Sequence, residues 1–129
     1  MSIALLCLLF AAVLILLTKV PVAMAMARMP GGYDNHHPRA QQARLEGFGA
    51  RALASHQNML EAFPVFAAGL LAALVSGADG HWTTLLALAF VAARVVYTIL
   101  YLADFHLLRS LSWGAGFGAS IGLMVLALL

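Results

Sequence analysis

Polar side chains gather in one short stretch of an otherwise apolar chain, residues 51–64, which read RALASHQNMLEAFP. Within this stretch Arg51, Asn58 and Glu61 are spaced seven and three residues apart, so on a helix they share one face. An arginine guanidinium binds carboxylates through two parallel hydrogen bonds. A glutamate accepts hydrogen bonds from amines or amides, and an asparagine amide both donates and accepts. This stripe is therefore suited to hold a small, polar, charged molecule.

A second polar stripe lies further along the chain. Arg94, Tyr97 and Tyr101 are spaced three and four residues apart, so they too lie on one helix face. In one interpretation Arg94 pairs with Glu61, and the pair simply holds two helices together. In the other, the two stripes face each other and line a pocket, which also accounts for the asparagine and the two tyrosines.

The composition indicates that both stripes belong to membrane helices. Of the 129 residues, 64% are hydrophobic and 9% are charged, and the mean hydropathy is +0.96, whereas soluble domains carry about 25% charged residues. We therefore expect an integral membrane protein with lipids as partners. Ionisable groups facing lipid are costly and usually point into a bundle or a wet cavity. The net charge of +2 is too small and scattered for nucleic-acid binding.

Four stretches of the chain are candidates to cross a bilayer, which takes about 20 apolar residues in a helix. They are residues 3–27, 44–76, 82–103 and 110–129. The segment RMPGGYDNHHPRAQQAR between the first two is a loop by its proline and glycine residues, and the other two connections are short. Short connections make consecutive spans antiparallel, so the sequence predicts an all-α, up-down four-helix bundle in one domain, residues 1–129.

The orientation follows from the positive charges of the connections. Arg28, Arg39 and Arg44 lie in or beside the first connection and Arg109 ends the third, whereas the second contains neither lysine nor arginine. Positive connections stay in the cytoplasm. We therefore expect the first and third connections to be cytoplasmic and both termini to lie outside.

The sequence predicts no metal site, because no helix shows a histidine or carboxylate spacing typical of metal ligands. It also lacks a glycine-rich phosphate loop and a Gly-x-Ser-x-Gly motif. The single cysteine, Cys7, allows no internal disulfide. In the last span Gly114, Gly118 and Gly122 are four residues apart. Such a seam of small residues lets helices of the same chain, or of another copy, approach closely.

The 51–64 stretch resembles the second-helix motif of the MAPEG family, the membrane-associated proteins in eicosanoid and glutathione metabolism. That motif reads approximately R-A-x-x-A-H-x-N-x-x-E-x-x-P. The stretch from Arg94 to Asp104, followed by LRSLSW at 108–113, resembles the third helix of this family and the start of the fourth. The resemblance to short bacterial members extends over the whole chain in length, polar first loop and topology.

The resemblance implies a homotrimer in the bacterial inner (plasma) membrane. Glutathione would be a co-substrate, bound between protomers near the cytoplasmic side. Arg109 matches an arginine that in some members stabilises the glutathione thiolate, and Ser110 follows it as a serine does in some members. The candidate site residues are therefore Arg109 and Ser110 as catalytic residues, and Arg51, Asn58, Glu61, Arg94, Tyr97 and Tyr101 as glutathione-binding residues. The chain departs from the best-studied glutathione-using members at Ala54, where they carry a further arginine.

Two classes of function stay open. The first is a glutathione-dependent transferase or peroxidase acting on lipophilic electrophiles or hydroperoxides. The second is a non-catalytic membrane protein of the same fold, with a structural or assembly role or with another small anionic or lipid ligand. Arg109 separates the two, because a structural assembly needs Glu61 to be paired but needs no arginine facing a cavity.

Overall fold

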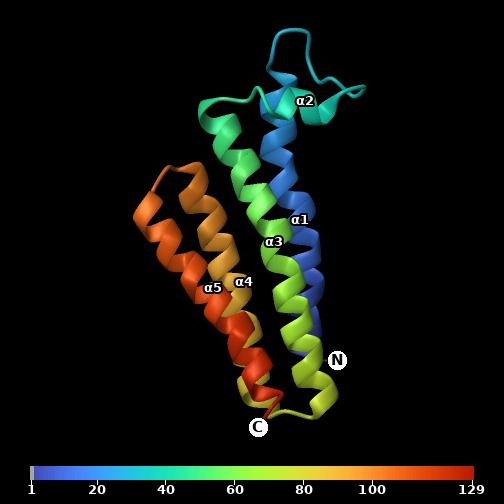
Figure 1. The fold of residues 1–129 in the computed structure, drawn as a ribbon, viewed down its shortest axis with the longest axis vertical. Helices are drawn as coiled ribbons and strands as arrows, with labels where there is room; N and C mark the ends of the chain where they lie inside the picture. The colour runs from blue at the N-terminus through green and yellow to red at the C-terminus, as the bar shows by residue number, and fades with distance from the viewer. Residues whose placement is uncertain (1) are drawn as a thin grey trace.

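The computed structural model describes residues 2–129, which form four long helices and one short helix, with no strand among them. The long helices are α1 (Ile3–Ala27), α3 (Gly47–Ser76), α4 (Gly80–Leu102) and α5 (His106–Leu126), and α2 (Pro38–Gln42) lies in the first connection. In Figure 1 the long helices run alternately up and down, with the α1–α3 and α4–α5 connections at the top and the C-terminus at the bottom. The predicted all-α class is confirmed.

Three of the helices are long and apolar enough to cross a membrane: α1, α3 and α4. Three of the predicted ranges therefore contain a helix that could cross a membrane, although α3 begins at Gly47 and not at residue 44. α5 falls short because four glycines, three serines and Arg109 occupy much of its length. It begins at His106, four residues earlier than the predicted span. A fourth membrane crossing over 110–129 stays a prediction.

α1 is apolar around its whole circumference, as expected of a helix surrounded by lipid and protein. Its buried residues recur every three or four positions and pack against α3 and α4; they are Ala4, Cys7, Ala11, Leu14, Thr18, Val22 and Met26. Its other face exposes large apolar side chains, among them Leu9 and Leu16. An exposed surface of this kind suits a bilayer and not water.

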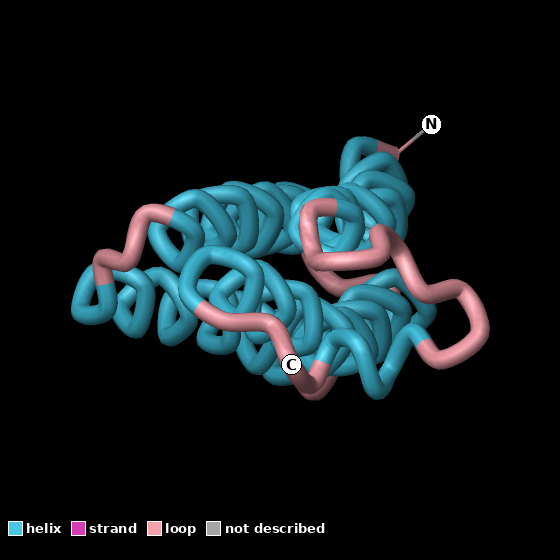
Figure 2. Tube along the Cα trace, turned by 90° about the horizontal axis from the view of Figure 1, so that it is seen from above, coloured by secondary structure: helices cyan, strands magenta, loops and turns pink. Residues whose placement is uncertain are grey.

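The α1–α3 connection is held by one buried side chain, Gln41, which is 2% exposed. Its Nε2 donates to the backbone oxygens of Gly32 at 2.8 Å and Met26 at 3.4 Å, and its Oε1 accepts from the backbone N–H of Asp34 at 2.9 Å. Figure 2 looks down onto this end of the molecule. The glutamine thus satisfies backbone groups that the loop would otherwise leave unpaired.

The other two connections are tight and make consecutive helices antiparallel neighbours. Gly77 ends α3 in the left-handed conformation, at φ 72°, and the carboxylate of Asp79 caps the first turn of α4. After α4, Asp104 adopts φ 66°, and the N–H of Phe105 donates back to the carbonyl of Leu100 at 2.9 Å. This tight turn reverses the direction of the chain directly after α4, so α5 packs along α4 and α3.

α3 and α5 meet most closely at Gly69. A Cβ atom on Gly69 would lie 2.6 Å from the backbone oxygen of Ser120, so only glycine fits there. Beside this contact the rings of Phe66 and Phe90 stack with centroids 3.9 Å apart and an interplanar angle of 3°. The close approach and the stacked rings form the apolar base on which the polar residues of α3 and α4 sit.

The predicted seam of small residues on the last helix is divided between two surroundings. Gly122 packs inside the chain, where an added Cβ would meet the side chain of Leu86 at 3.2 Å. Added Cβ atoms on Gly114 and Gly118 would meet nothing within 4 Å. Only part of the seam therefore serves packing within this chain.

Candidate functional site

The centre of the polar region is Arg94, a charged side chain that is 1% exposed in the middle of α4. Its Nη1 donates to Oδ1 of Asn58 on α3 at 2.8 Å, and its guanidinium lies 4.1 Å from the ring centroid of Tyr97. Its Nε and Nη2 are buried and have no hydrogen-bond partner in residues 2–129. Burying a charge with unpaired donors costs several kcal/mol, so this side chain calls for an external acceptor.

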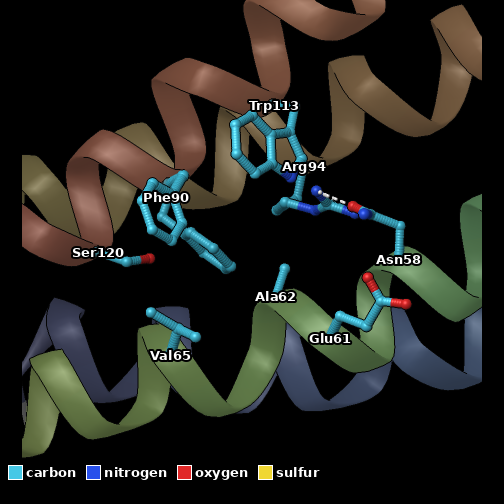
Figure 3. Close-up of a pocket in the computed structure, with 9 residues that line it drawn as sticks. Asn58, Glu61, Ala62, Val65, Phe90, Arg94, Trp113 and Ser120 are labelled. Atoms are coloured by element: carbon cyan, nitrogen blue, oxygen red, sulfur yellow. Dashed lines mark hydrogen bonds between the residues drawn. The ribbon is translucent and has the colours of Figure 1, made fainter.

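A pocket of about 180 Å³ opens beside this guanidinium, between α3, α4 and α5. Figure 3 shows Arg94 and Asn58 joined at one end of it, with Ser120 at the other. Its walls are largely apolar; the full lining is Asn58, Glu61, Ala62, Val65, Phe90, Arg94, Trp113, Phe117 and Ser120. The pocket thus combines a polar end, where a charged group can be held, with apolar walls.

Glu61 lines the same pocket but forms no ion pair with Arg94. Within residues 2–129 the only ion pair within 4.0 Å joins Asp34 and His37 in the first connection. Glu61 is also exposed, so its carboxylate stays open to another partner. The interpretation in which Glu61 and Arg94 serve only to tie two helices together by pairing is therefore wrong. Asn58, and not Glu61, binds Arg94, because the two side chains meet across the α3–α4 contact.

A second pocket, of about 170 Å³, adjoins the first at Trp113. It is lined by Tyr97, Tyr101, Arg109, Ser110 and Trp113. The guanidinium of Arg109 lies 4.2 Å from the ring centroid of Tyr101, and the rings of Tyr97 and Tyr101 meet edge to face at 5.6 Å. The rings of the two tyrosines therefore lie between the guanidinium groups of Arg94 and Arg109. The indole of Trp113 lines both pockets.

The hydroxyl of Ser110 is partly committed. It donates to the backbone oxygen of His106 at 3.0 Å, as serines in helices commonly do. Its oxygen can still accept a hydrogen bond beside Arg109, and the residue is exposed to the second pocket.

The family model for the MAPEG family matches residues 3–129 of this chain. The chain belongs to the MAPEG family. It matches no curated protein and no solved structure, so membership rests on the family match and on the motif residues. The resemblance seen in the sequence is thereby confirmed, and this is a membrane protein of the MAPEG family.

In this MAPEG protein, seven of the eight predicted site residues line the two adjoining pockets, and Arg51 does not. Both Nε and Nη2 of Arg51 lie 3.4 Å from the backbone oxygen of Leu102 and donate to it. That oxygen belongs to the last turn of α4, where carbonyls lack partners inside the helix. In the single chain Arg51 therefore caps α4 and fastens it to α3.

The α5 wall of the first pocket was absent from the sequence-based prediction. Trp113, Phe117 and Ser120 are spaced four and three residues apart and line one side of the pocket, and the rings of Trp113 and Phe117 stack with centroids 5.3 Å apart. This spacing is a helix face that the sequence displays. Aromatic residues of a membrane helix also face lipid, however, so the spacing alone does not identify a pocket wall.

Across residues 2–129, no three histidine, cysteine, aspartate or glutamate side chains lie close enough together to hold a metal ion.

The remaining polar contact between long helices joins α1 and α3, where the hydroxyl of Thr18 lies 3.0 Å from Nδ1 of His56. The same hydroxyl lies 2.9 Å from the carbonyl oxygen of Ile15, to which it donates, and it accepts from His56 in the tautomer that carries a proton on Nδ1.

Proposed function

We propose that this protein binds glutathione in the two adjoining pockets and uses its thiolate against lipophilic electrophiles or hydroperoxides. The observation that carries the proposal is the buried guanidinium of Arg94, with two unpaired donors beside a pocket. A carboxylate placed there would satisfy both donors in the two-point geometry that arginine favours. Glutathione has two carboxylates, an ammonium group and a thiol, and the pocket residues offer a complement to each.

The assignment of groups follows the charges. Arg94 takes a carboxylate, and Glu61, which has no ion-pair partner within residues 2–129, takes the ammonium group. The second pocket then receives the cysteinyl part, with its sulfur near Arg109. A cation close to a thiol lowers its pKa and raises the fraction present as thiolate, the reactive form. Ser110 and the two tyrosines offer polar contacts around the sulfur.

The chemistry that such a thiolate performs is simple. With an electrophile, the sulfur forms a carbon–sulfur bond and the leaving group, or the displaced electron pair, takes up a proton. With a hydroperoxide, the sulfur attacks the outer oxygen, the O–O bond breaks, and the alcohol leaves. A second glutathione then displaces water from the resulting sulfenic acid and gives the disulfide. The protein's part is to bind the tripeptide, stabilise its thiolate and admit the second substrate.

Two observations support a lipophilic second substrate and a shared site. Trp113 and Phe117 line the pocket and are 44% and 45% exposed, so the pocket is accessible from the apolar outer surface. Each pocket is also smaller than the roughly 300–1,000 Å³ of ordinary ligand sites. A neighbouring copy can supply the missing walls, and the open glycines Gly114 and Gly118 offer it a close contact. We therefore propose a homotrimer in a bacterial inner membrane, with the site near the cytoplasmic end.

A second function has its own support. The hydrogen bond that Arg94 donates to Asn58 and the cap that Arg51 places on α4 both fasten α3 to α4. These contacts would also serve a membrane protein that binds an anionic ligand, or builds an assembly, without catalysis. The two functions differ at Arg109, whose side chain donates no hydrogen bond within residues 2–129 and is needed only for thiolate chemistry.

The test is thiolate formation and turnover in the detergent-purified protein. We expect glutathione to give the ultraviolet difference absorbance of a bound thiolate and to be consumed with a lipophilic electrophile or hydroperoxide. Arg109→Ala should lose both signals, Arg109→Lys should recover part of them, and Ser110→Ala should lower turnover. If wild type shows neither a thiolate signal nor turnover while binding glutathione, the non-catalytic alternative holds.

A further inference from the structure

A third pocket lies at the start of α3, apart from the proposed glutathione site. It encloses about 430 Å³ where the end of α1 meets the start of α3, and it shares no residue with the two pockets described above. Two arginines line it, Arg28 at the C-cap of α1 and Arg44 just before α3. Together with Glu46 they give the pocket a net charge of plus one.

The two arginines are not used by the fold. Within residues 2–129 the arginine side chains that donate hydrogen bonds belong to Arg51 and Arg94, and the only ion pair joins Asp34 and His37. Glu46 therefore lines the pocket without pairing with either guanidinium. Both arginines are exposed, and both can turn toward one anionic group held between them.

The other residues that line the pocket are mostly apolar. Met24 and Phe48, which are 51% and 45% exposed, line it together with Met29. Its floor is the place where α1 and α3 approach so closely that a Cβ on Gly49 would lie 3.1 Å from that of Ala25. A ligand for this pocket thus needs an anionic head at the helix ends and an apolar part along α1 and α3.

We propose that this pocket binds an anionic phospholipid, with the phosphate between Arg28 and Arg44 and an acyl chain against Met24 and Phe48. The location favours a lipid over a free phosphate compound, because the pocket lies where α1 ends at Ala27 and α3 begins at Gly47, and both helices are long and apolar enough to cross a membrane. Basic pockets at such positions bind anionic lipid head groups. Glu46 disfavours additional negative charge, so a head group with a single phosphate charge fits best.

The experiment uses the full-length protein in detergent, stripped of lipid and titrated with phosphatidylglycerol or phosphatidylcholine in native mass spectrometry. We expect wild type to prefer phosphatidylglycerol. Arg28→Gln and Arg44→Gln should each weaken its binding about fivefold, the effect of one basic residue near an anionic head group. Arg39→Gln is the matched control: Arg39 is an exposed arginine of the same connection that does not line the pocket, and it should change binding less than twofold.

Three results would overturn the proposal. Equal affinity for phosphatidylglycerol and phosphatidylcholine would show that the pocket does not select the net negative charge of the head group. An equal loss in Arg39→Gln would show a general effect of surface charge. Displacement of the lipid by glycerol phosphate or by glutathione at equal concentration would make the pocket a site for a soluble anion. Glu46→Gln is a variant for which we expect stronger binding. Removing this carboxylate should tighten phosphatidylglycerol binding, and such a gain cannot result from misfolding.

Discussion

Replacing Arg94 by methionine should abolish glutathione binding without weakening the fold. The substitution removes one charge-assisted hydrogen bond to Asn58 at 2.8 Å, worth about 1.5–3 kcal/mol. It also removes the contact with Tyr97 at 4.1 Å, worth about 0.5–2 kcal/mol. Against these losses stands the cost of keeping a 1% exposed charge with two unpaired donors, which is several kcal/mol.

The two sides of this comparison nearly cancel. Replacing a buried ion pair by apolar side chains of similar volume is often neutral or stabilising by about 1–4 kcal/mol, and the guanidinium of Arg94 has no ion pair within residues 2–129 to lose. We therefore expect the free energy of unfolding of Arg94→Met to lie within about 1 kcal/mol of wild type, or above it. Asn58→Ala should behave in the opposite way, because it strips the buried guanidinium of its remaining partner and should cost about 1–3 kcal/mol.

The assay is denaturant unfolding in mixed micelles, with and without glutathione. Wild type should gain stability with ligand, since a ligand that binds only the folded state stabilises it; Arg94→Met should gain none. Arg51→Met is the matched control, because Arg51 caps α4 outside both pockets, and this variant should keep the ligand effect. A loss of 3 kcal/mol or more in Arg94→Met, with little change in Asn58→Ala, would refute the reasoning and make Arg94 a structural residue.

Three other substitutions test the frame around the site. Gly69→Ala places a Cβ 2.6 Å from a backbone oxygen of α5, so we expect a loss of about 1–3 kcal/mol in unfolding free energy and weaker glutathione binding. The same change at Gly80, where an added Cβ meets nothing within 4 Å, should be almost neutral; equal effects at both sites would contradict the close helix contact. Asp104→Gly should raise the melting temperature, because glycine adopts φ 66° without the penalty of a side chain; a lower melting temperature would show that the carboxylate itself is needed. Ala54→Arg adds a guanidinium one turn before Asn58 on the same helix face, and in calorimetry it should tighten glutathione binding about fivefold to tenfold; unchanged affinity would place that face outside the ligand's reach.

Much of the architecture could be predicted because long apolar runs and turn residues mark helices and their ends. The first span coincides with α1, Ile3–Ala27, since a polar serine precedes it and a glycine-containing loop follows it. α5 begins at His106, four residues before the span that the sequence predicts from residue 110. The reason is local: Asp104 adopts the left-handed conformation directly after α4. Residues other than glycine adopt this conformation rarely, so the sequence does not predict the turn at this position.

Helical spacing predicts where a candidate site residue lies when its side chain is short. It predicts the contacts less well when the side chain is long enough to reach several neighbouring groups. Asn58 and Glu61 lie where their spacing placed them, facing α4 and α5. Arg51 shares their stripe, yet its long side chain reaches the end of α4. The pairing of Arg94 with Asn58, and not with Glu61, depends on the offset between α3 and α4 along their axes. Helical spacing within one segment carries no information on that offset.

The most direct test of the glutathione site is calorimetric titration of the detergent-purified protein with glutathione, beside Glu61→Gln and Arg109→Ala. The account predicts saturable binding in wild type at micromolar to low-millimolar concentration. Both variants should lose it, because each removes a charged group that lines one of the two pockets and forms no ion pair within residues 2–129. An absence of heat up to tens of millimolar glutathione, from protein that remains folded and assembled, would contradict the account and assign the pocket to another ligand.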